Sequence, residues 1–218
     1  MYEELTRLQK KHRLKAAEML ADSFFDNPLF IYLFPDERKR SRILQNVYRS
    51  TVEIADEISD VYVTSDRVEG IFAVRRTGNH SFSPALYKAI LKTIFRSLLL
   101  IKDLQVVSFI KKARRLSIIS KRMAFYEKQK PHLVLDMVAV NKKFRGQKFM
   151  SQMIRAALKE ADIRRTFCVL ETETIENVRI YEHFGFQLSQ SIEVIKDQLT
   201  VYILVYDPHQ QIIYADKA

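Results

Sequence analysis

The chain has very little cysteine and no long apolar run. Its single cysteine, Cys168, excludes an internal disulfide framework and indicates a reducing compartment. No apolar stretch approaches the roughly 20 residues that a membrane-spanning helix needs. Residues 1–15 are charged throughout and lack the apolar centre of a signal peptide. We therefore expect a soluble, cytoplasmic protein with no membrane partner.

Metal-ligand patterns and abundant glycine are also missing. The histidines are scattered without paired ligand spacing, so we expect no metal site. No zinc-finger or RNA-recognition signature stands out, and we expect no specific nucleic-acid partner. Only four glycines are present, and two of them, Gly146 and Gly185, lie inside the motifs described below.

The composition that remains is that of an ordinary globular protein. The 218 residues are 47% hydrophobic and 28% charged, which is enough to bury one core, and we expect a single domain over residues 1–218. The net charge is +10. This balance favours an anionic partner such as nucleic acid, acidic lipid or a polyphosphorylated cofactor, and charge alone does not choose among them.

Hydrophobic periodicity predicts alternating strands and helices. We expect strands over residues 3–8, 61–64, 68–75, 133–140, 166–171, 187–195 and 199–205, and helices over 11–25, 36–58, 146–161 and 175–184, with a chain break at 26–28. This order predicts an α/β (α+β) protein with a mixed sheet and helices on both faces.

Residues 83–128 are expected to form a helical insertion of two helices, broken near Asp103. The segment is amphipathic and rich in lysine and arginine. Such a helix can lie on an anionic membrane. The alternative is a helical pair that packs on the sheet with its basic side in water, and we favour it because basic exposed faces are common on a chain this basic.

A basic turn follows the most apolar strand of the sequence. Residues 133–140 are apolar apart from Asp136, as expected of a strand that is buried on both faces. Residues 141–147 then lead into a helix, where unpaired backbone N–H groups and the helix dipole favour an anion. Arg145 and Lys148 add full positive charges, so the turn predicts a phosphate site.

A second motif places a phenol near a tight turn. Asn177 and Tyr181 are four residues apart and share one face of the expected helix 175–184, and Gly185 and Phe186 follow.

Together these motifs resemble the GNAT superfamily of N-acetyltransferases, best over residues 133–186. The phosphate loop of that family follows the pattern Arg/Gln-x-x-Gly-x-Gly/Ala, and here Lys148 and Met150 stand at its two small positions. Small residues there let the backbone approach phosphate closely. Residues 24–28 and 33–38 also look like the N-terminal helices of the small-molecule acetyltransferases in this superfamily.

The resemblance implies the GNAT fold, a mixed and mostly antiparallel central sheet with a splayed parallel strand pair. It also implies acetyl-CoA as cosubstrate, with its pantetheine arm hydrogen-bonded to the first of these two strands. The implied cofactor-binding residues are Met137, Val138, Val140, Arg145, Gly146, Gln147, Lys148, Phe149, Met150 and Asn177. Tyr181 would donate a proton to the departing thiolate.

A general base is also needed, because an alkylammonium must lose a proton before it attacks. The candidates are Asp136, Glu171 and Glu173, and we place Glu171 and Asp136 with Tyr181 as catalytic residues. Asp136 is the only charge in an apolar strand, where burial would raise its pKa. A structural carboxylate is the alternative for Asp136.

We therefore expect an acetyltransferase in which a primary amine attacks acetyl-CoA directly in a ternary complex. The acceptor is a small molecule, or a peptide N-terminus or lysine, and a homodimer is possible. Two alternatives stay open. One is a CoA-binding sensor or interaction protein without turnover, and the other is a basic membrane-surface or nucleic-acid binder.

Overall fold

The computed structural model describes residues 2–78, 83–99, 106–210 and 212. The strands are β1 (Thr6–Arg7), β2 (Asp60–Val63), β3 (Gly70–Arg76), β4 (Leu133–Val140), β5 (Cys168–Thr172), β6 (Gln187–Ile195) and β7 (Leu199–Tyr206). The helices are α1 (Lys10–Ser23), α2 (Pro28–Leu33), α3 (Glu37–Ile58), α4 (Pro84–Leu99), α5 (Val106–Glu127), α6 (Phe149–Arg164) and α7 (Ile175–His183), with a 3₁₀ turn, η1 (Lys142–Phe144).

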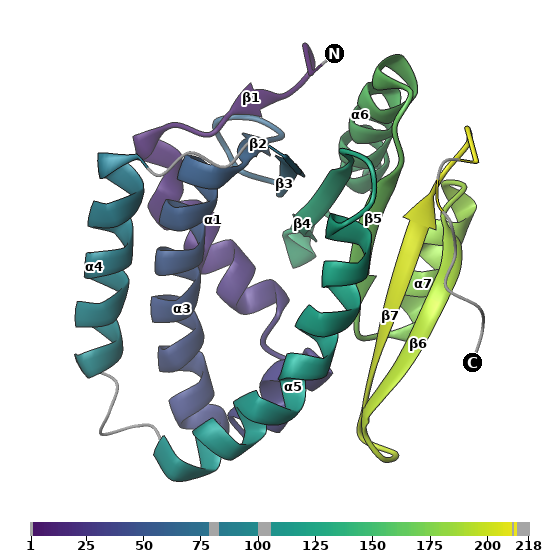
Figure 1. The fold of residues 1–218 in the computed structure, drawn as a ribbon. Coiled ribbons are helices and arrows are strands. Elements are labelled where there is room, and N and C mark those ends of the chain that lie inside the picture. Colours follow the sequence, from purple (N-terminus) through teal and green to yellow (C-terminus); the bar gives the residue numbers. More distant parts are fainter. Residues whose placement is uncertain (1, 79–82, 100–105, 211, 213–218) are drawn as a thin grey trace.

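The seven strands form one sheet in the order β1-β2-β3-β4-β5-β7-β6. Every neighbouring pair is antiparallel except β4 and β5, which run parallel in the middle of the sheet. The expected mixed, mostly antiparallel sheet with one parallel pair is confirmed (Figure 1).

Helices cover both faces of this sheet, as expected. On one face α1 and α3 pack on the half of the sheet that contains β2 and β3, and their core includes Leu20, Leu44 and Ile71. On the other face α6 and α7 pack on the central strands, around Met153 and Leu170. Helix α5 packs through Tyr126 against β5, β6 and β7. Helix α4 packs on the outer side of α3 (Figure 1).

A bulge in β4 separates the two halves of that strand. Ala73 pairs with Met137, whereas the next residue of β3, Val74, pairs with Leu135, so β4 has one extra residue, Asp136. The bulge changes which side chains face which layer. Leu135 packs on the α6 side before it, and Met137 packs on the α1 side after it.

Strands β4 and β5 part at the same point. Their parallel pairing covers three residues of each strand and ends at Leu135 and Leu170. Beyond it, β5 continues beside β7 through Thr172, while β4 continues beside β3 through Val140. The splayed pair implied by the resemblance is therefore present, and the carboxyl half of β4 is open toward β5.

The structure differs from the expected secondary structure at two places. The helix expected from residue 146 begins at Phe149, because Gly146 and Lys148 both have left-handed backbone, with φ of 80° and 64°. The break expected at residues 26–28 is present between α1 and α2, but α2 itself was not expected; Asn27 caps this helix and Pro28 occupies its first position. The break expected near Asp103 lies outside the described residues.

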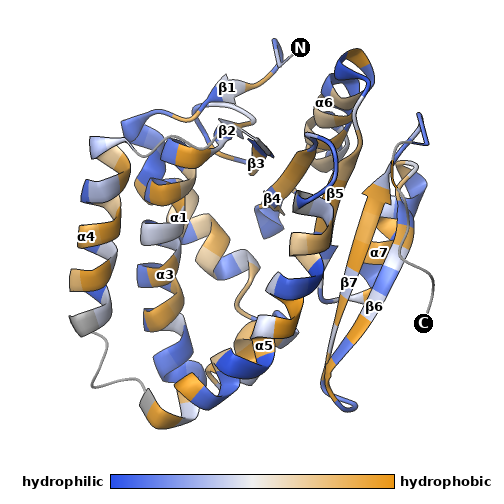
Figure 2. Cartoon of the chain, in the orientation of Figure 1, coloured by the Kyte–Doolittle hydropathy of each residue, from blue (hydrophilic) through white to orange (hydrophobic). Residues whose placement is uncertain are grey.

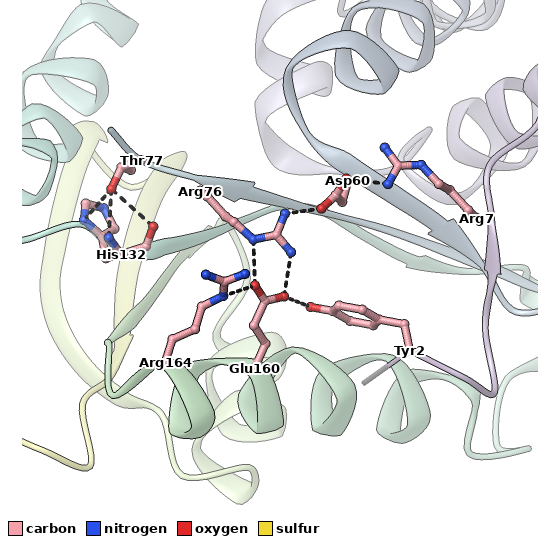
Figure 3. Close-up of polar contacts among 8 residues, drawn as sticks. All are labelled: Tyr2, Arg7, Asp60, Arg76, Thr77, His132, Glu160 and Arg164. Carbon is pink, nitrogen blue, oxygen red and sulfur yellow. Dashed lines mark hydrogen bonds and ion pairs between the residues drawn. The ribbon is translucent and has the colours of Figure 1, made fainter. Parts of the chain in front are cut away.

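A buried ion network joins the N-terminal segment and strands β2 and β3 to helix α6. Glu160 of α6 is fully buried and accepts hydrogen bonds from Arg76 at 2.6 and 2.9 Å, from Arg164 at 2.5 Å and from the Tyr2 hydroxyl at 2.6 Å (Figure 3). Arg76 also pairs with Asp60. Burial alone would raise the pKa of Glu160, but the hydrogen bonds and charges of its partners hold it below the usual value.

Replacing Glu160 with glutamine is expected to lower the free energy of unfolding by about 3 kcal/mol at pH 7, because two guanidinium groups lose their buried counter-charge. Since the native pKa is depressed, the stabilisation is present above the unfolded value near ~4.3 and is lost as the pH falls below it. Urea unfolding at pH 7 and below pH ~4 measures both effects. The control is Glu18→Gln, an exposed glutamate of α1. An equal, small loss for both variants at pH 7 would contradict the assignment.

Candidate functional site

A cavity of about 650 Å³ lies where β4 diverges from β5. Its walls are the end of β4, the N-terminus of α6, one face of α7 and the junction of α1 and α2. Most of the predicted cofactor residues line it: Val138, Val140, Arg145, Gly146, Lys148, Phe149, Met150 and Asn177, together with the predicted acid Tyr181. Residues far apart in the sequence therefore meet at one site.

The charged residues that line this cavity are mostly cations. Lys142, Arg145 and Lys148 lie in the turn between β4 and α6, and the one lining carboxylate, Asp26, pairs with Lys142 at 3.6 Å. Lys148 stands at the N-cap position of α6 but makes no side-chain capping hydrogen bond. The first N–H groups of α6 and its dipole therefore add to the three cations, which suits an anionic group such as a pyrophosphate.

The α7 wall holds the polar side chains of the second motif. Thr174 caps α7 by accepting from the Asn177 backbone N–H, and the Asn177 amide donates to the Thr172 hydroxyl at 2.9 Å. Tyr181, one turn further, is 6% exposed. Burial, and then the nearby charge of Glu173, raises the pKa of the Tyr181 phenol. Tyr181 therefore remains protonated at neutral pH and able to donate.

Two predicted cofactor residues do not line the cavity. Gln147 is exposed on the turn. Met137 follows the bulge and packs in the core under α1 and α3, on the other face of the sheet. Its backbone, which the resemblance implies as the hydrogen-bonding part, belongs to the half of β4 that is open toward β5.

Glu171 and Asp136, the two carboxylates predicted to be catalytic, line a second cavity of about 260 Å³ with Arg75 and residues of α5. The Glu171 side chain is exposed in this cavity, but the surrounding protein displaces much of the water that would otherwise solvate its carboxylate. This burial, followed by the negative charges of Glu173 and Asp136, raises the pKa of Glu171 to about 7. A carboxylate with that pKa can exchange a proton near neutral pH.

The expected burial of Asp136 was wrong. Its side chain is at the surface of the bulge and accepts an ion-paired hydrogen bond from Arg75 at 3.1 Å. The bulge turns the extra residue out of the apolar alternation. The single charge in an apolar run therefore marks the irregularity in the strand and not a buried acid.

The site also contains residues that sequence reasoning missed. Asn27 lines the first cavity, and its amide donates to Glu173 at 2.9 Å. Burial raises the pKa of Glu173, and the charge of Glu173 in turn raises those of Tyr48 and Tyr181. An asparagine followed by proline is a helix-start signal that could have located Asn27. Nothing local to the sequence could have indicated its contact with Glu173, 146 residues later.

No group of His, Cys, Asp and Glu side chains suited to a metal ion occurs within the described parts of the chain. Cys168 is buried in the core, and burial raises the pKa of its thiol. The polar groups that surround the two cavities are therefore carboxylates, a phenol, an amide and cations, which suit proton transfer and the binding of phosphates.

Comparison with known proteins finds one family model that matches part of the chain and solved structures that share its fold. Residues 96–186 match the family model of the acetyltransferase (GNAT) family. An uncharacterized N-acetyltransferase of Schizosaccharomyces pombe is 23% identical, and the match covers 94% of this chain and 83% of that protein.

Solved structures share the fold over nearly the whole chain. A Corynebacterium glutamicum protein described as histone acetyltransferase HPA2 and related acetyltransferase superposes with a TM-score of 0.62 at 15% identity, over 96% of this chain and 99% of that one. Arylalkylamine N-acetyltransferase 2 from Aedes aegypti superposes with a TM-score of 0.59 at 15% identity, over 92% and 96% of the two chains.

The left-handed backbone of Lys148 explains why a small residue suits this position. The strain of this conformation can be tested by substitution. Lys148→Gly should be more stable than Lys148→Ala by about 1 kcal/mol, because only glycine adopts this conformation without strain. Both variants lose the same charge, so the difference in their free energies of unfolding isolates the backbone. An alanine variant at least as stable as the glycine variant would contradict a left-handed backbone conformation at residue 148.

Proposed function

We propose that this chain is an acetyltransferase of the GNAT superfamily and that it transfers the acetyl group of acetyl-CoA to a primary amine. The acceptor is a small molecule or the amino group of a peptide. The amine attacks the thioester directly while both substrates are bound, so a C–N bond forms as the C–S bond breaks.

The observation that supports this proposal most strongly is the composition of the 650 Å³ cavity. One continuous space is lined by three cations, an uncapped helix N-terminus, the open edge of β4 and the phenol of Tyr181. An elongated cosubstrate with a pyrophosphate at one end and a thioester at the other needs these groups in this order.

Acetyl-CoA would bind with its pyrophosphate at the turn between β4 and α6. Arg145 and Lys148 supply charge, and the first N–H groups of α6 supply hydrogen bonds. The pantetheine arm would then follow Val138 and Val140, where β4 has no pairing with β5. The peptide-like groups of that arm need hydrogen-bond partners, and the backbone N–H and C=O groups of the open strand edge would provide them. Asn177 faces the same space from α7.

Tyr181 would act as the acid. The departing thiolate takes the phenolic proton, and this prevents the reverse reaction; the tyrosinate then takes the second proton that the nitrogen loses as the amide forms. The raised pKa of Tyr181 keeps that proton in place until the thiolate forms. Asn177 and Tyr181 are on one face of α7, which holds the cofactor contact and the acid in a fixed relation.

Glu171 would act as the base for the acceptor ammonium. It lies on β5, and the 260 Å³ cavity that it lines with α5 is also lined by Leu135, the residue after which β4 and β5 part. Its pKa of about 7 lets it accept a proton from the incoming ammonium and release it to water at neutral pH. Asp136 at the same cavity is paired with Arg75, so the negative charge that would favour a cationic acceptor is that of ionised Glu171.

The first test is the variant Tyr181→Phe, assayed by thiol release with acetyl-CoA and a panel of primary amines. We expect turnover to fall about 100-fold while acetyl-CoA affinity stays nearly unchanged, since the lost hydroxyl acts only on the leaving sulfur. Tyr206→Phe is the matched control, because the Tyr206 hydroxyl bonds Asp162 away from the cavity. Equal turnover in Tyr181→Phe and the wild type would remove Tyr181 from the mechanism. Binding of acetyl-CoA with no turnover on any amine would favour a CoA-binding sensor instead.

The second test is the pH dependence of kcat/KM. The ionised form of Glu171 is the base, so activity should rise as the pH increases through about 7. In Glu171→Gln this limb should disappear, with activity at pH ~8 lower by about 100-fold. Glu176→Gln, at the exposed start of α7, should keep the wild-type profile. A limb that persists in Glu171→Gln would assign the base to another group, and Glu173 would be examined next.

A further inference from the structure

The net charge of this protein is concentrated in one segment. Residues 83–128, which connect β3 and β4 through α4 and α5, contain eleven lysines and arginines and only two acidic residues. The segment therefore accounts for nine of the ten net positive charges of the chain, and all the remaining residues together are nearly neutral. Such an asymmetry indicates an anionic partner for this segment.

The same helices expose large apolar side chains. On α4, Tyr87, Leu91, Ile94 and Phe95 follow one another at helical spacing, and each is about half exposed or more. On α5, Val107 is 70% exposed and Ile110 is 46% exposed. Seven of the fourteen large hydrophobic side chains that the described residues expose belong to these two helices. Figure 2 shows the resulting alternation of hydrophobic and hydrophilic bands on both.

The inner sides of the helices are already occupied. Arg96 of α4 pairs with Glu53 of α3 at 2.9 Å. Phe109 of α5 stacks on Phe34, and Lys112 donates to the Tyr32 carbonyl at 2.8 Å. These contacts hold α4 and α5 against the body of the protein and fix which residues face outward. Lys88, Lys111, Arg114 and Arg115 are exposed and belong to the outer side.

We propose that the outer side of α4 and of the first half of α5 lies on the surface of an anionic lipid membrane. The apolar side chains would enter the boundary between headgroups and acyl chains, and the lysines and arginines would contact the lipid phosphates. No helix in the described part of the chain is long and apolar enough to cross a membrane. Contact of this kind is therefore confined to the surface of the bilayer.

Charge and polarity select this partner over two others. A second copy of the chain docking through the same surface would bring the cations Lys88, Lys111, Arg114 and Arg115 against the same four cations, which is unfavourable. A nucleic acid would neutralise the charge, but its phosphates offer nothing to Leu91, Ile94 or Val107. Of these three partners, the lipid interface alone accepts both the cations and the aliphatic side chains. The sequence favoured a helical pair whose basic side faces water. The exposed apolar side chains beside those cations are the reason that we now favour the membrane surface.

The test is flotation of the full chain with vesicles of phosphatidylcholine alone or with about 30% phosphatidylserine. We expect binding only to the anionic vesicles, weakening as salt rises from about 0.1 M to about 0.5 M. The variant Lys111→Gln, Arg114→Gln, Arg115→Gln should lower the partition coefficient on the order of 100-fold, since each basic residue contributes about fivefold. The matched control, Lys10→Gln, Lys15→Gln, Lys196→Gln, removes three exposed charges elsewhere and should bind like the wild type.

The chain has no tryptophan, so a single introduced one reports on its own position. Phe95→Trp on α4 should shift its emission to shorter wavelength when anionic vesicles are added. Ile163→Trp, which replaces an equally exposed side chain of α6, should not shift. Circular dichroism checks that both variants are folded. Tyr87→Trp provides a second reporter on α4.

Three results would overturn the proposal. The first is the absence of binding to anionic vesicles by the folded wild type. The second is binding without an emission shift at either α4 reporter, because that places the apolar side chains outside the lipid. The third is a single-stranded oligonucleotide that binds more tightly than the vesicles at equal salt and competes for the same three cations. That result would make nucleic acid the partner.

Discussion

Strands β4 and β5 leave each other after Leu135 and Leu170, and the candidate site is built around that point. The bulge at Asp136 lets β4 continue beside β3 while it parts from β5, and it reverses which side chains face α6. Had the parallel pairing continued, the backbone of Val138 and Val140 would be occupied by β5. The divergence instead leaves an open strand edge between two cavities.

The two cavities differ in charge, and this difference gives them their roles. The 650 Å³ cavity is bordered by three cations, Lys142, Arg145 and Lys148, and one carboxylate, Asp26, whereas the 260 Å³ cavity is bordered by two carboxylates, Asp136 and Glu171, and one cation, Arg75. In the proposed reaction, an anionic cosubstrate and a cationic acceptor would be drawn to opposite sides of the same strand pair. Glu173 is close enough to influence the pKa values of both Glu171 and Tyr181, and it links the two sides electrostatically.

The central half of the chain was largely predictable because its signals are local. The apolar run 133–140, the basic turn after it and the spacing of Asn177 and Tyr181 each lie within a few residues, and β4 and β6 have the predicted ends. The start of α6 was missed because the left-handed backbone of Lys148 delays the helix by three residues, and lysine gives no sign of it. Glycine at this position would have been a visible signal.

Errors elsewhere came from contacts between distant residues. The orientation of Met137 and the exposure of Asp136 depend on a bulge that exists only when β3 pairs with β4. The contact of Asn27 with Glu173 depends on α2 folding over the end of β5. The separation of Glu171 from Tyr181 into two cavities follows from the parting of the strands. The hydrophobic pattern and the secondary-structure propensity of a segment do not say which other segments it contacts in the fold. These features therefore could not be predicted from the sequence of one segment alone.

The measurement that tests the account most directly is calorimetric titration of acetyl-CoA into the wild type, Arg145→Ala and Lys159→Ala. The cavity at the parted strands predicts a Kd in the micromolar range, about −8 kcal/mol. Arg145→Ala should bind at least tenfold more weakly, since a charge-assisted contact to phosphate contributes about 1.5–3 kcal/mol. Lys159→Ala, an exposed cation of α6 outside the cavity, should bind like the wild type. Equal affinities in all three proteins, or no binding by the folded wild type, would contradict the assignment of this cavity to acetyl-CoA.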